Sequence, residues 1–429
     1  MSNTLFTNVR IIDGTGAAPY AGEVLVQGNR ISRVTRGGRP QPVAGVTVID
    51  AGGATLMPGM CESHLHLAWS NAPTLDSIQL MPLEEHMLLT AANAKLYLDH
   101  GFTSGCGAAT AKPRLDVVVR NSINEGLIPG PRYLAASPEI TVAGSLGDDT
   151  LPHLPFEEFS FGKVVSGPEE MRKAVRTFLK YGVDSIKLNL SGDNFVPHAN
   201  SRTSWMSDEE VAMAVRETKL RGKRNIVHAR SQESIQQALR HKVELLYHVS
   251  YTDEETLDML EAQKNHIFIV PTFSVLVELA YRGEPYGLPK GSEMQRNMEH
   301  ELEACAKSMR ALHKRGLRIL PGGDYGFAWA KHGENAKDLI HLVDYAGMTP
   351  MEAILSATRL GGQIMMMPDE LGQVREGFLA DLLLVDGDPL ADLTVLQDRN
   401  KLLAIMKDGA FHKEPELRAS RTRWSLPAA

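Results

Sequence analysis

The residues of this chain best suited to chemistry are histidines, a lysine and an aspartate, each near the end of a short apolar run. They are His64, His66, Lys187, His228, His248 and Asp324. His64 and His66 lie in LMPGMCESHLHL, separated by one residue. Side chains alternate along a strand, so both imidazoles point to the same face. A metal ion that keeps a position open for water needs further protein ligands, and we expect these from distant segments.

Lys187 interrupts the apolar strand VDSIKLNL, which should be buried on both faces. Burial lowers the pKa of a lysine, and a neutral amine reacts with carbon dioxide to give a carbamate. A carbamate is an anionic group that bridges two divalent metals. The alternative is a lysine held in the barrel wall by a salt bridge.

His228 in RNIVHARS and His248 in VELLYHVSY lie one predicted strand apart, which places both imidazoles within reach of a second metal. Each is alternatively a hydrogen-bonded histidine of the core. Asp324 follows two glycines in ILPGGDYGF, and these allow a tight turn that presents the carboxylate to the metals. We expect Asp324 to act as general acid and base. The alternative is a turn aspartate that binds its own backbone.

The elements that position these residues alternate between apolar runs and amphipathic segments. The predicted strands lie at 60–66, 101–105, 131–137, 183–190, 224–231, 243–251, 266–274 and 317–326. Helix signals separate them, such as the capping box of Ser207 and Glu210. This alternation predicts an α/β fold with a (β/α)8 TIM-like barrel. Barrel enzymes carry their chemistry at the carboxyl ends of the strands, where the candidate ligands lie.

The two ends of the chain have a different pattern, with short alternating strands separated by Gly and Pro. We predict that 1–57 and 371–429 pair into one small β-sandwich domain and that 58–370 form the barrel. Two discontinuous segments would then flank the catalytic domain.

The composition limits the partners of the protein. Lys and Arg total 45 against 52 Asp and Glu in 429 residues, a net charge of −7 that argues against nucleic acid or an anionic membrane. Cys61, Cys106 and Cys305 form no CxxC pair, which favours a reducing compartment. No apolar run approaches a membrane span. These features predict a cytoplasmic protein that binds small molecules.

The chain resembles the amidohydrolase superfamily, in particular its two-metal members with a carbamylated lysine. PGMCESHLHL resembles the first-strand pattern PGxxDxHxHL, SIKLNLSG the lysine strand, and PGGDYG the last turn. NIVHARS and LLYHVSYTDEE resemble the two single-histidine strands, and LGQVREGFLADLLLVDGDPL the returning sandwich strand. The resemblance extends over nearly the whole chain.

This resemblance implies a set of metal ligands. His64, His66 and Asp324 would hold one divalent metal, and His228 and His248 a second. Carbamylated Lys187 would bridge the two metals, and a bridging hydroxide would be the nucleophile. Zinc is the expected metal, with cobalt, manganese or iron as alternatives that the same ligands accept. Homo-oligomers are usual among similar proteins.

The chain departs from this pattern around the substrate. Relatives that cleave dipeptides carry GGH after the third strand, whereas ITVAGSLGDD stands here, and the usual SGG after the lysine strand is SGD at 191–193. Glu62 replaces the first-strand aspartate. Tyr251 and Arg230 are candidate contacts to a substrate carboxylate, and His332 is a further candidate substrate contact.

These departures favour hydrolysis of a C–N bond in an uncharged amide, urea or carbamate, including aryl and xenobiotic compounds. The alternative is a dipeptidase for Xaa-Pro or Xaa-Arg, or a carboxypeptidase for N-acyl amino acids. A mononuclear deaminase would carry a glutamate where Ser231 stands, three residues after His228.

Overall fold

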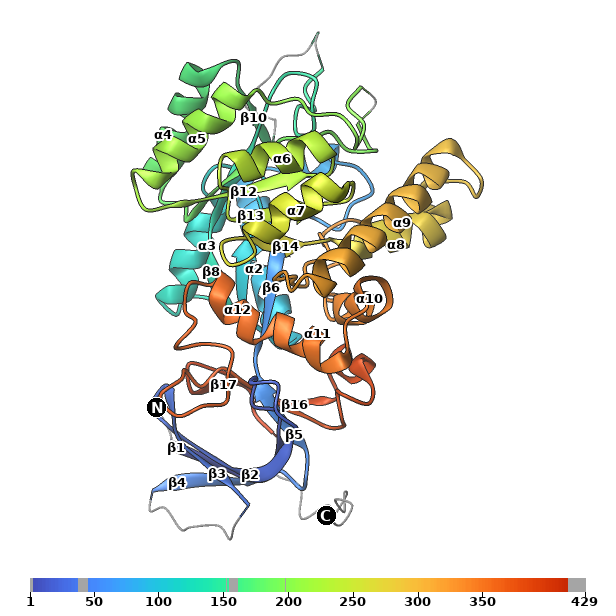
Figure 1. Cartoon of the computed structure of the whole chain (residues 1–429). Coiled ribbons are helices and arrows are strands. Elements are labelled where there is room, and N and C mark those ends of the chain that lie inside the picture. The colour runs from blue at the N-terminus through green and yellow to red at the C-terminus, as the bar shows by residue number, and fades with distance from the viewer. Residues whose placement is uncertain (1–2, 38–44, 152, 154–160, 197, 416–429) are drawn as a thin grey trace.

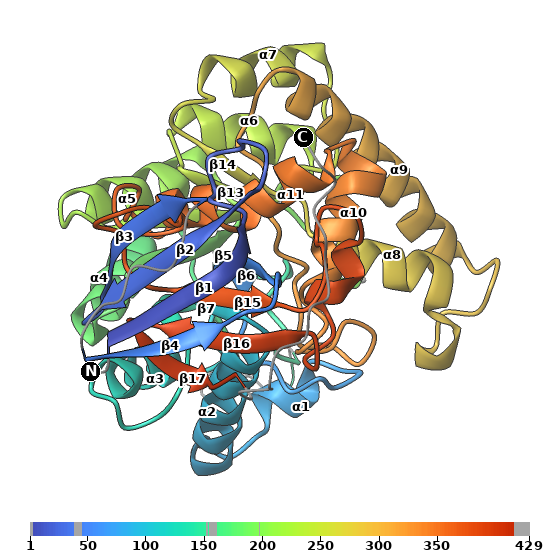
Figure 2. The same ribbon diagram turned by 90° about the horizontal axis from the view of Figure 1, so that it is seen from below.

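The computed structural model describes residues 3–37, 45–151, 153, 161–196 and 198–415. The predicted terminal domain includes 38–44 and 416–429, which lie outside these residues. Strands from both ends of the chain form one eight-stranded sheet at one end of the molecule (Figures 1 and 2). They are β1 (Asn3–Ile11), β2 (Tyr20–Gln27), β3 (Arg30–Arg36), β4 (Val46–Asp50), β5 (Thr55–Pro58), β15 (Leu382–Val385), β16 (Leu402–Lys407) and β17 (Ala410–Lys413).

This terminal sheet branches at β1. Residues 3–7 of β1 pair with β4, and 10–11 pair with β5, with an irregularity between Phe6 and Val9. Asn8 has a left-handed backbone (φ 52°), a conformation that asparagine tolerates better than most residues. β15 pairs with β5, so strands from the two ends of the chain lie side by side in this sheet.

The central part of the chain forms parallel strands in a six-stranded and a three-stranded sheet. They are β6 (Met60–Leu65), β7 (Phe102–Gly107), β8 (Arg132–Leu134), β9 (Ala136–Thr141), β10 (Gly162–Val164), β11 (Ser185–Asn189), β12 (Arg224–Ala229), β13 (Leu245–His248) and β14 (Phe268–Val270). Their residues are almost all buried, as expected for parallel strands covered on both faces.

The predicted closed eight-stranded ladder is interrupted at two places. The third predicted strand is divided at Ala135, with β8 pairing with β7 and β9 with β11. The strand predicted at 317–326 is only an isolated bridge from Ile319 to Ile269. Pro321 offers no N–H to a ladder, and two glycines follow it. Its carbonyl still accepts from Ser63 N at 3.3 Å, which links this segment to β6.

Helices cover the parallel strands (Figure 1). They are α1 (Asp76–Gln79), α2 (Leu83–Asp99), α3 (Leu115–Asn124), α4 (Pro168–Tyr181), α5 (Asp208–Lys219), α6 (Gln232–Arg240), α7 (Glu254–Ala262), α8 (Phe273–Arg282), α9 (Glu293–Lys314), α10 (Lys337–Ala346), α11 (Pro350–Ala357) and α12 (Arg359–Ile364), with 3-10 turns η2 (Glu284–Tyr286) and η3 (Leu393–Leu396). The predicted capping box of Ser207 and Glu210 is confirmed at the start of α5. None of the described helices has the length and apolar character needed to cross a bilayer.

Candidate metal centre and its cavity

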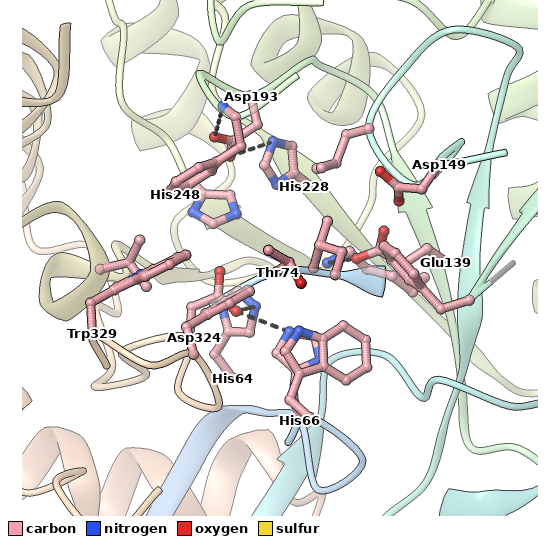
Figure 3. Close-up of a pocket in the computed structure, with 18 of the residues that line it drawn as sticks. His64, His66, Thr74, Glu139, Asp149, Asp193, His228, His248, Asp324 and Trp329 are labelled. Atoms are coloured by element: carbon pink, nitrogen blue, oxygen red, sulfur yellow. Dashed lines mark hydrogen bonds and ion pairs between the residues drawn. The ribbon is translucent and has the colours of Figure 1, made fainter. Parts of the chain in front are cut away.

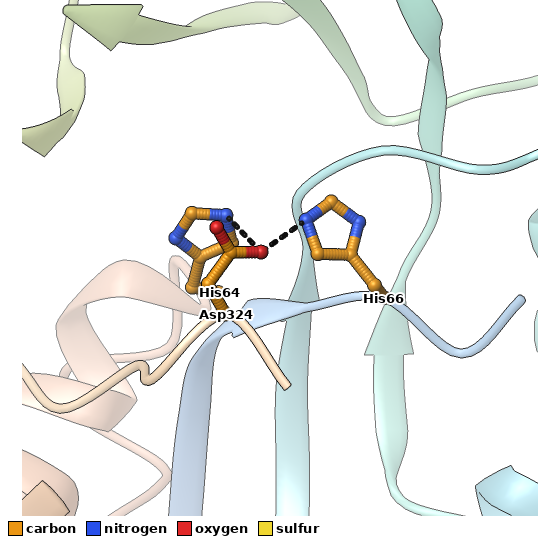
Figure 4. A group of neighbouring side chains, drawn as sticks. All are labelled: His64, His66 and Asp324. Carbon is orange, nitrogen blue, oxygen red and sulfur yellow. Dashed lines mark ion pairs between the residues drawn. The ribbon is translucent and has the colours of Figure 1, made fainter. Parts of the chain in front are cut away.

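Three of the predicted ligands meet at the carboxyl end of β6. Asp324 Oδ1 lies 3.4 Å from His64 Nε2 and 3.1 Å from His66 Nε2, between the two imidazoles (Figure 4). In the described part of the chain, these residues form the only group of three or more His, Cys, Asp or Glu side chains whose ligand atoms all lie within 4.8 Å of one another. The alternation along β6 therefore produces the convergence that the HxH pattern predicts.

The donor chemistry of this group fits a divalent cation. His66 Nδ1 lies 3.0 Å from the Ala109 carbonyl, which only accepts, so Nδ1 carries the proton and Nε2 the lone pair. That lone pair faces the Asp324 carboxylate, and two electron-rich atoms at this distance suit a cation bound between them. His64 is buried, and neither of its ring nitrogens has a hydrogen-bond partner. Buried polar atoms without partners are costly unless a ligand satisfies them.

Burial and neighbouring charges favour the ligating forms of His64 and Asp324. Burial lowers the pKa of His64 well below its ordinary value, which keeps the ring neutral. Burial also raises the pKa of Asp324, but the neighbouring His64, His66 and Lys187 outweigh this effect and bring the pKa below its ordinary value. At neutral pH the site thus offers neutral imidazole and ionised carboxylate.

The turn that carries Asp324 is held against β6. Asp324 has a left-handed backbone (φ 59°), which is uncommon for a residue with a side chain. A Cβ atom at Gly322 would lie 2.7 Å from His64 Cβ, so only glycine allows this approach. Gly322 N donates to Asp338 Oδ2 at 2.7 Å. Asp338 therefore fixes the turn from α10.

His228 and His248 form a second pair of imidazoles beside this group, with ring centroids 4.2 Å apart. The His248 ring lies 5.5 Å from that of His64. His228 Nε2 lies 3.1 Å from the Gly192 carbonyl, which leaves the Nδ1 lone pair for a ligand. Burial lowers the pKa of both histidines well below the ordinary value.

His248 is oriented by Thr272, which follows β14. Thr272 Oγ1 donates to the Pro271 carbonyl at 2.7 Å and accepts from His248 Nδ1 at 2.6 Å. His248 Nε2 therefore keeps its lone pair. His248 and Thr272 both have left-handed backbones, with φ 76° and 59°. Strained conformations of this kind concentrate at functional sites.

Lys187 is buried in β11, at the wall of the same cavity. Its Nζ lies 4.0 Å from Glu139 Oε1, too far for a hydrogen bond, and 5.0 Å from the centre of the Tyr247 ring. Burial lowers the pKa of Lys187, while Glu139 and Asp324 oppose this effect. The surroundings of Lys187 thus destabilise its charged form relative to that of an exposed lysine.

All six predicted ligands line one cavity of about 310 Å³ (Figure 3). Of the three predicted substrate contacts, only Arg230 lines this cavity. The Tyr251 hydroxyl lies 3.3 Å from Ser201 Oγ, outside the cavity wall. His332 is buried behind Trp69, with Nε2 3.0 Å from the Trp69 carbonyl and Nδ1 3.0 Å from the Tyr97 hydroxyl.

Aromatic side chains form much of the remaining wall, and sequence reasoning missed them. They are Trp69, Phe161, Phe195, Phe327 and Trp329. Trp329 stacks on Phe327 with centroids 5.1 Å apart and on Phe195 at 5.6 Å. One signal in the sequence is FAW at 327–329, directly after the predicted last turn. The cavity therefore combines a polar metal-ligand wall with an aromatic wall.

Comparison with known proteins agrees with this geometry. The model of the amidohydrolase family matches residues 55–411. Ochratoxinase from Aspergillus niger is 27% identical over 386 residues, which cover 84% of this chain and 76% of that protein. The crystal structure of an amidohydrolase superposes with a TM-score of 0.86 at 26% identity and covers 97% of this chain and 100% of that chain.

A further similar crystal structure is that of a prolidase complexed with N-methylphosphonate-L-proline. Its TM-score is 0.84 at 25% identity, and the match covers 96% of this chain and 100% of that chain. Such neighbours imply a TIM barrel with an additional domain. Because the family match runs from β5 to β17 and includes the metal-ligand group, this chain belongs to the amidohydrolase family and is a hydrolase.

Proposed function

We propose that this protein is a metal-dependent hydrolase that cleaves the C–N bond of an amide, urea or carbamate in an uncharged small molecule bearing an aryl group. One observation carries the proposal. The His64, His66 and Asp324 group and Lys187 face the same cavity as the aromatic wall. A cavity of about 310 Å³ is at the small end of ligand sites, which suits a compact substrate.

The residues fit two divalent cations, with zinc as the expected metal. His64, His66 and Asp324 would hold one, and His228 and His248 the other, with carbamylated Lys187 between them. When bound, such cations lower the pKa of water toward neutrality and polarise a carbonyl group. The histidines hold their ligating tautomers through the Ala109 carbonyl, the Gly192 carbonyl and Thr272.

Asp324 is the proposed proton carrier. Its side chain is 16% exposed, against 1% for His64, so it reaches the cavity from the ligand group. A carboxylate at this position takes the proton of the attacking water and delivers it to the departing nitrogen. Amides, ureas and carbamates need this protonation because their nitrogen leaves poorly.

The substrate class rests on the aromatic wall and on the charge of Arg230. Trp329, Phe327 and Phe195 offer stacked ring faces, on which a planar aryl group binds favourably. Arg230 is already paired with two carboxylates, and these compensate its positive charge. This arrangement supports a neutral substrate over a carboxylate-bearing one.

The alternative is a dipeptidase or an N-acyl amino acid carboxypeptidase, which the similarity to the prolidase favours. It would need Arg230 and Tyr251 as carboxylate contacts. A deaminase is less consistent with the site, since Ser231 serves as the N-cap of α6. Assembly as a homo-oligomer and a cytoplasmic location stay predictions.

A substrate panel followed by mass spectrometry tests the proposal. Protein loaded with zinc or cobalt is offered aryl amides, phenylureas and carbamates beside Xaa-Pro dipeptides and N-acyl amino acids. We expect turnover of the neutral compounds and its loss in Lys187→Ala. Turnover confined to carboxylate-bearing compounds would establish the alternative, and full activity of Lys187→Ala would refute the two-metal assignment.

A further inference from the structure

A buried ion cluster borders the cavity on the side of His228 and joins Asp193, Arg230 and Glu301. Arg230 Nε lies 2.8 Å from Asp193 Oδ2, and Arg230 Nη1 lies 2.5 Å from Glu301 Oε1. All three side chains are at most 6% exposed. One cation therefore faces two carboxylates at the edge of the proposed active site.

The two carboxylates differ in their position. Glu301 comes from α9 and does not line the cavity. Its carboxylate accepts hydrogen bonds from Ser250 Oγ at 2.7 Å and from Asn194 Nδ2 at 2.8 Å. Asp193 follows β11 and lines the cavity together with Arg230 (Figure 3). Glu301 thus anchors the guanidinium from behind, and Asp193 is its partner on the cavity side.

The contact between Arg230 and Asp193 depends mainly on charge. Arg230 Nε makes no aligned hydrogen bond, although Asp193 Oδ2 is 2.8 Å away. A guanidinium in a ligand cavity normally attracts a carboxylate with paired hydrogen bonds. Here the Asp193 carboxylate occupies that side of the cation, and its own charge repels a second anion.

We propose that Asp193 is a specificity-determining residue that withholds Arg230 from the substrate and excludes carboxylate-bearing ligands from this end of the cavity. The proposal rests on the proposed function, because it explains why a hydrolase with a buried arginine at its cavity selects neutral amides. Asp193 is a positioning residue in this scheme and takes no part in bond cleavage.

A binding experiment with compounds that the enzyme does not hydrolyse tests this role apart from catalysis. The probes are N-benzenesulfonylglycine and N-(2-hydroxyethyl)benzenesulfonamide, which share the aryl sulfonamide and differ in the carboxylate. Calorimetry measures the affinity of both for metal-loaded wild type, Asp193→Asn and Glu301→Gln. Glu301→Gln is the matched control, because it removes the other carboxylate charge that is paired with Arg230, and Glu301 does not line the cavity.

We expect wild type to bind the alcohol at least as tightly as the carboxylate. In Asp193→Asn the affinity for the carboxylate relative to the alcohol should rise about 10-fold, the size of one charge-assisted hydrogen bond. Glu301→Gln should leave this ratio at the wild-type value. If Asp193→Asn does not fold, Asp193→Ser serves for the same comparison.

The proposal is overturned if wild type already prefers the carboxylate, if the ratio stays constant in the Asp193 variants, or if Glu301→Gln raises it equally. Failure of the proposed function has a different signature. In that case the binding ratio shifts as expected in Asp193→Asn while no amide, urea or carbamate of the substrate panel is hydrolysed.

Discussion

At the scale of the residue, Lys187 shows how burial prepares a side chain for chemistry. A buried ammonium normally has a close anionic partner, but the nearest carboxylate oxygen of Glu139 is 4.0 Å from Nζ. Conversion to a carbamate replaces a weakly compensated cation with an anion that a metal pair would neutralise. This view of Lys187 leads to a prediction about metal content.

We expect Lys187→Ala to bind less metal and to have a kcat more than about 100-fold below that of wild type. This loss exceeds the effect of removing a hydrogen bond that supports a metal ligand. Metal content is measured by elemental analysis. Metal-free wild type should regain activity only when zinc and bicarbonate are added together. Lys187→Arg keeps the charge but forms no carbamate, and its retention of full activity would contradict the prediction.

Thr272 provides a second prediction at this scale. Thr272→Val keeps the branched shape but removes the hydroxyl that accepts from His248 Nδ1, so the ring loses its fixed tautomer. We expect metal affinity to fall by about 10–100-fold, measured by competition with a chelator. Thr90→Val is the control, since the Thr90 hydroxyl donates to the His86 carbonyl within α2. Equal affinities in wild type and Thr272→Val would refute the role of this contact.

At the scale of the element, the segment 321–326 is the piece that brings Asp324 to β6. Gly322→Ala would place a Cβ atom 2.5 Å from Val270 Cγ1 and 2.7 Å from His64 Cβ, and both strands would have to shift. We expect about 1–3 kcal/mol lower stability from overpacking, together with reduced metal content. Thermal unfolding and elemental analysis measure the two effects.

Gly316→Ala is the matched control for that experiment. Gly316 has a left-handed backbone (φ 77°), and a Cβ atom there would meet nothing within 4 Å. Its replacement should lower stability through backbone strain alone and leave metal content unchanged. Metal loss of the same size in both variants would show that close packing at Gly322 does not position the ligands.

The comparison of sequence and structure also belongs to this scale. The HxH spacing predicted the convergence of His64 and His66, because strand alternation is a local property. The apolar run at 317–326 predicted a strand, but the structure has only an isolated bridge there. Pro321 was the local signal against a strand, because proline has no N–H to donate. The division of the third strand at Ala135 has no local cause, since it depends on which neighbours β8 and β9 meet.

The ion pairs of Arg230 could not be predicted from the sequence either. Arg230 was expected to meet a substrate carboxylate, but Glu301 approaches it from α9, 71 residues away in the chain. The aromatic wall comes from separate segments after several strands, and loop conformations of this kind are set by tertiary packing. Spacing within a segment was thus predictable, and contacts between segments were not.

At the scale of the whole molecule, the terminal sheet is attached to the parallel strands by an ion cluster around Arg132. Arg132 Nη2 lies 2.6 Å from Asp408 Oδ1 and 3.5 Å from Asp381 Oδ1. Lys407 Nζ donates to the Gly130 carbonyl at 3.0 Å. Burial raises the pKa of Asp381, and Arg132 opposes that rise.

Removal of Arg132 should therefore have a pH-dependent effect. A carboxyl group with a raised pKa costs stability as pH rises through that pKa, and the loss of Arg132 increases the cost. We expect Arg132→Ala to lower stability by about 2 kcal/mol at neutral pH, with a smaller deficit in acid where Asp381 is protonated. Thermal unfolding at several pH values measures this difference.

Arg30→Ala is the control for Arg132→Ala, since Arg30 pairs with Glu370 where both side chains are more than 40% exposed. That change should cost less than about 1 kcal/mol at every pH. A deficit of Arg132→Ala that grew toward acid would contradict the assignment of Asp381 as the buried partner.

The pairing of β5 with β15 has a consequence for biosynthesis. β5 leads directly into β6, and Thr55 Oγ1 donates to the carbonyl of Gly387, 332 residues later in the chain. During translation, β5 and the HxH segment that follows it emerge well before β15, the partner of β5, because the central part of the chain is synthesised between them. We therefore expect the nascent chain to depend on chaperones for most of its synthesis and to acquire its metals after release.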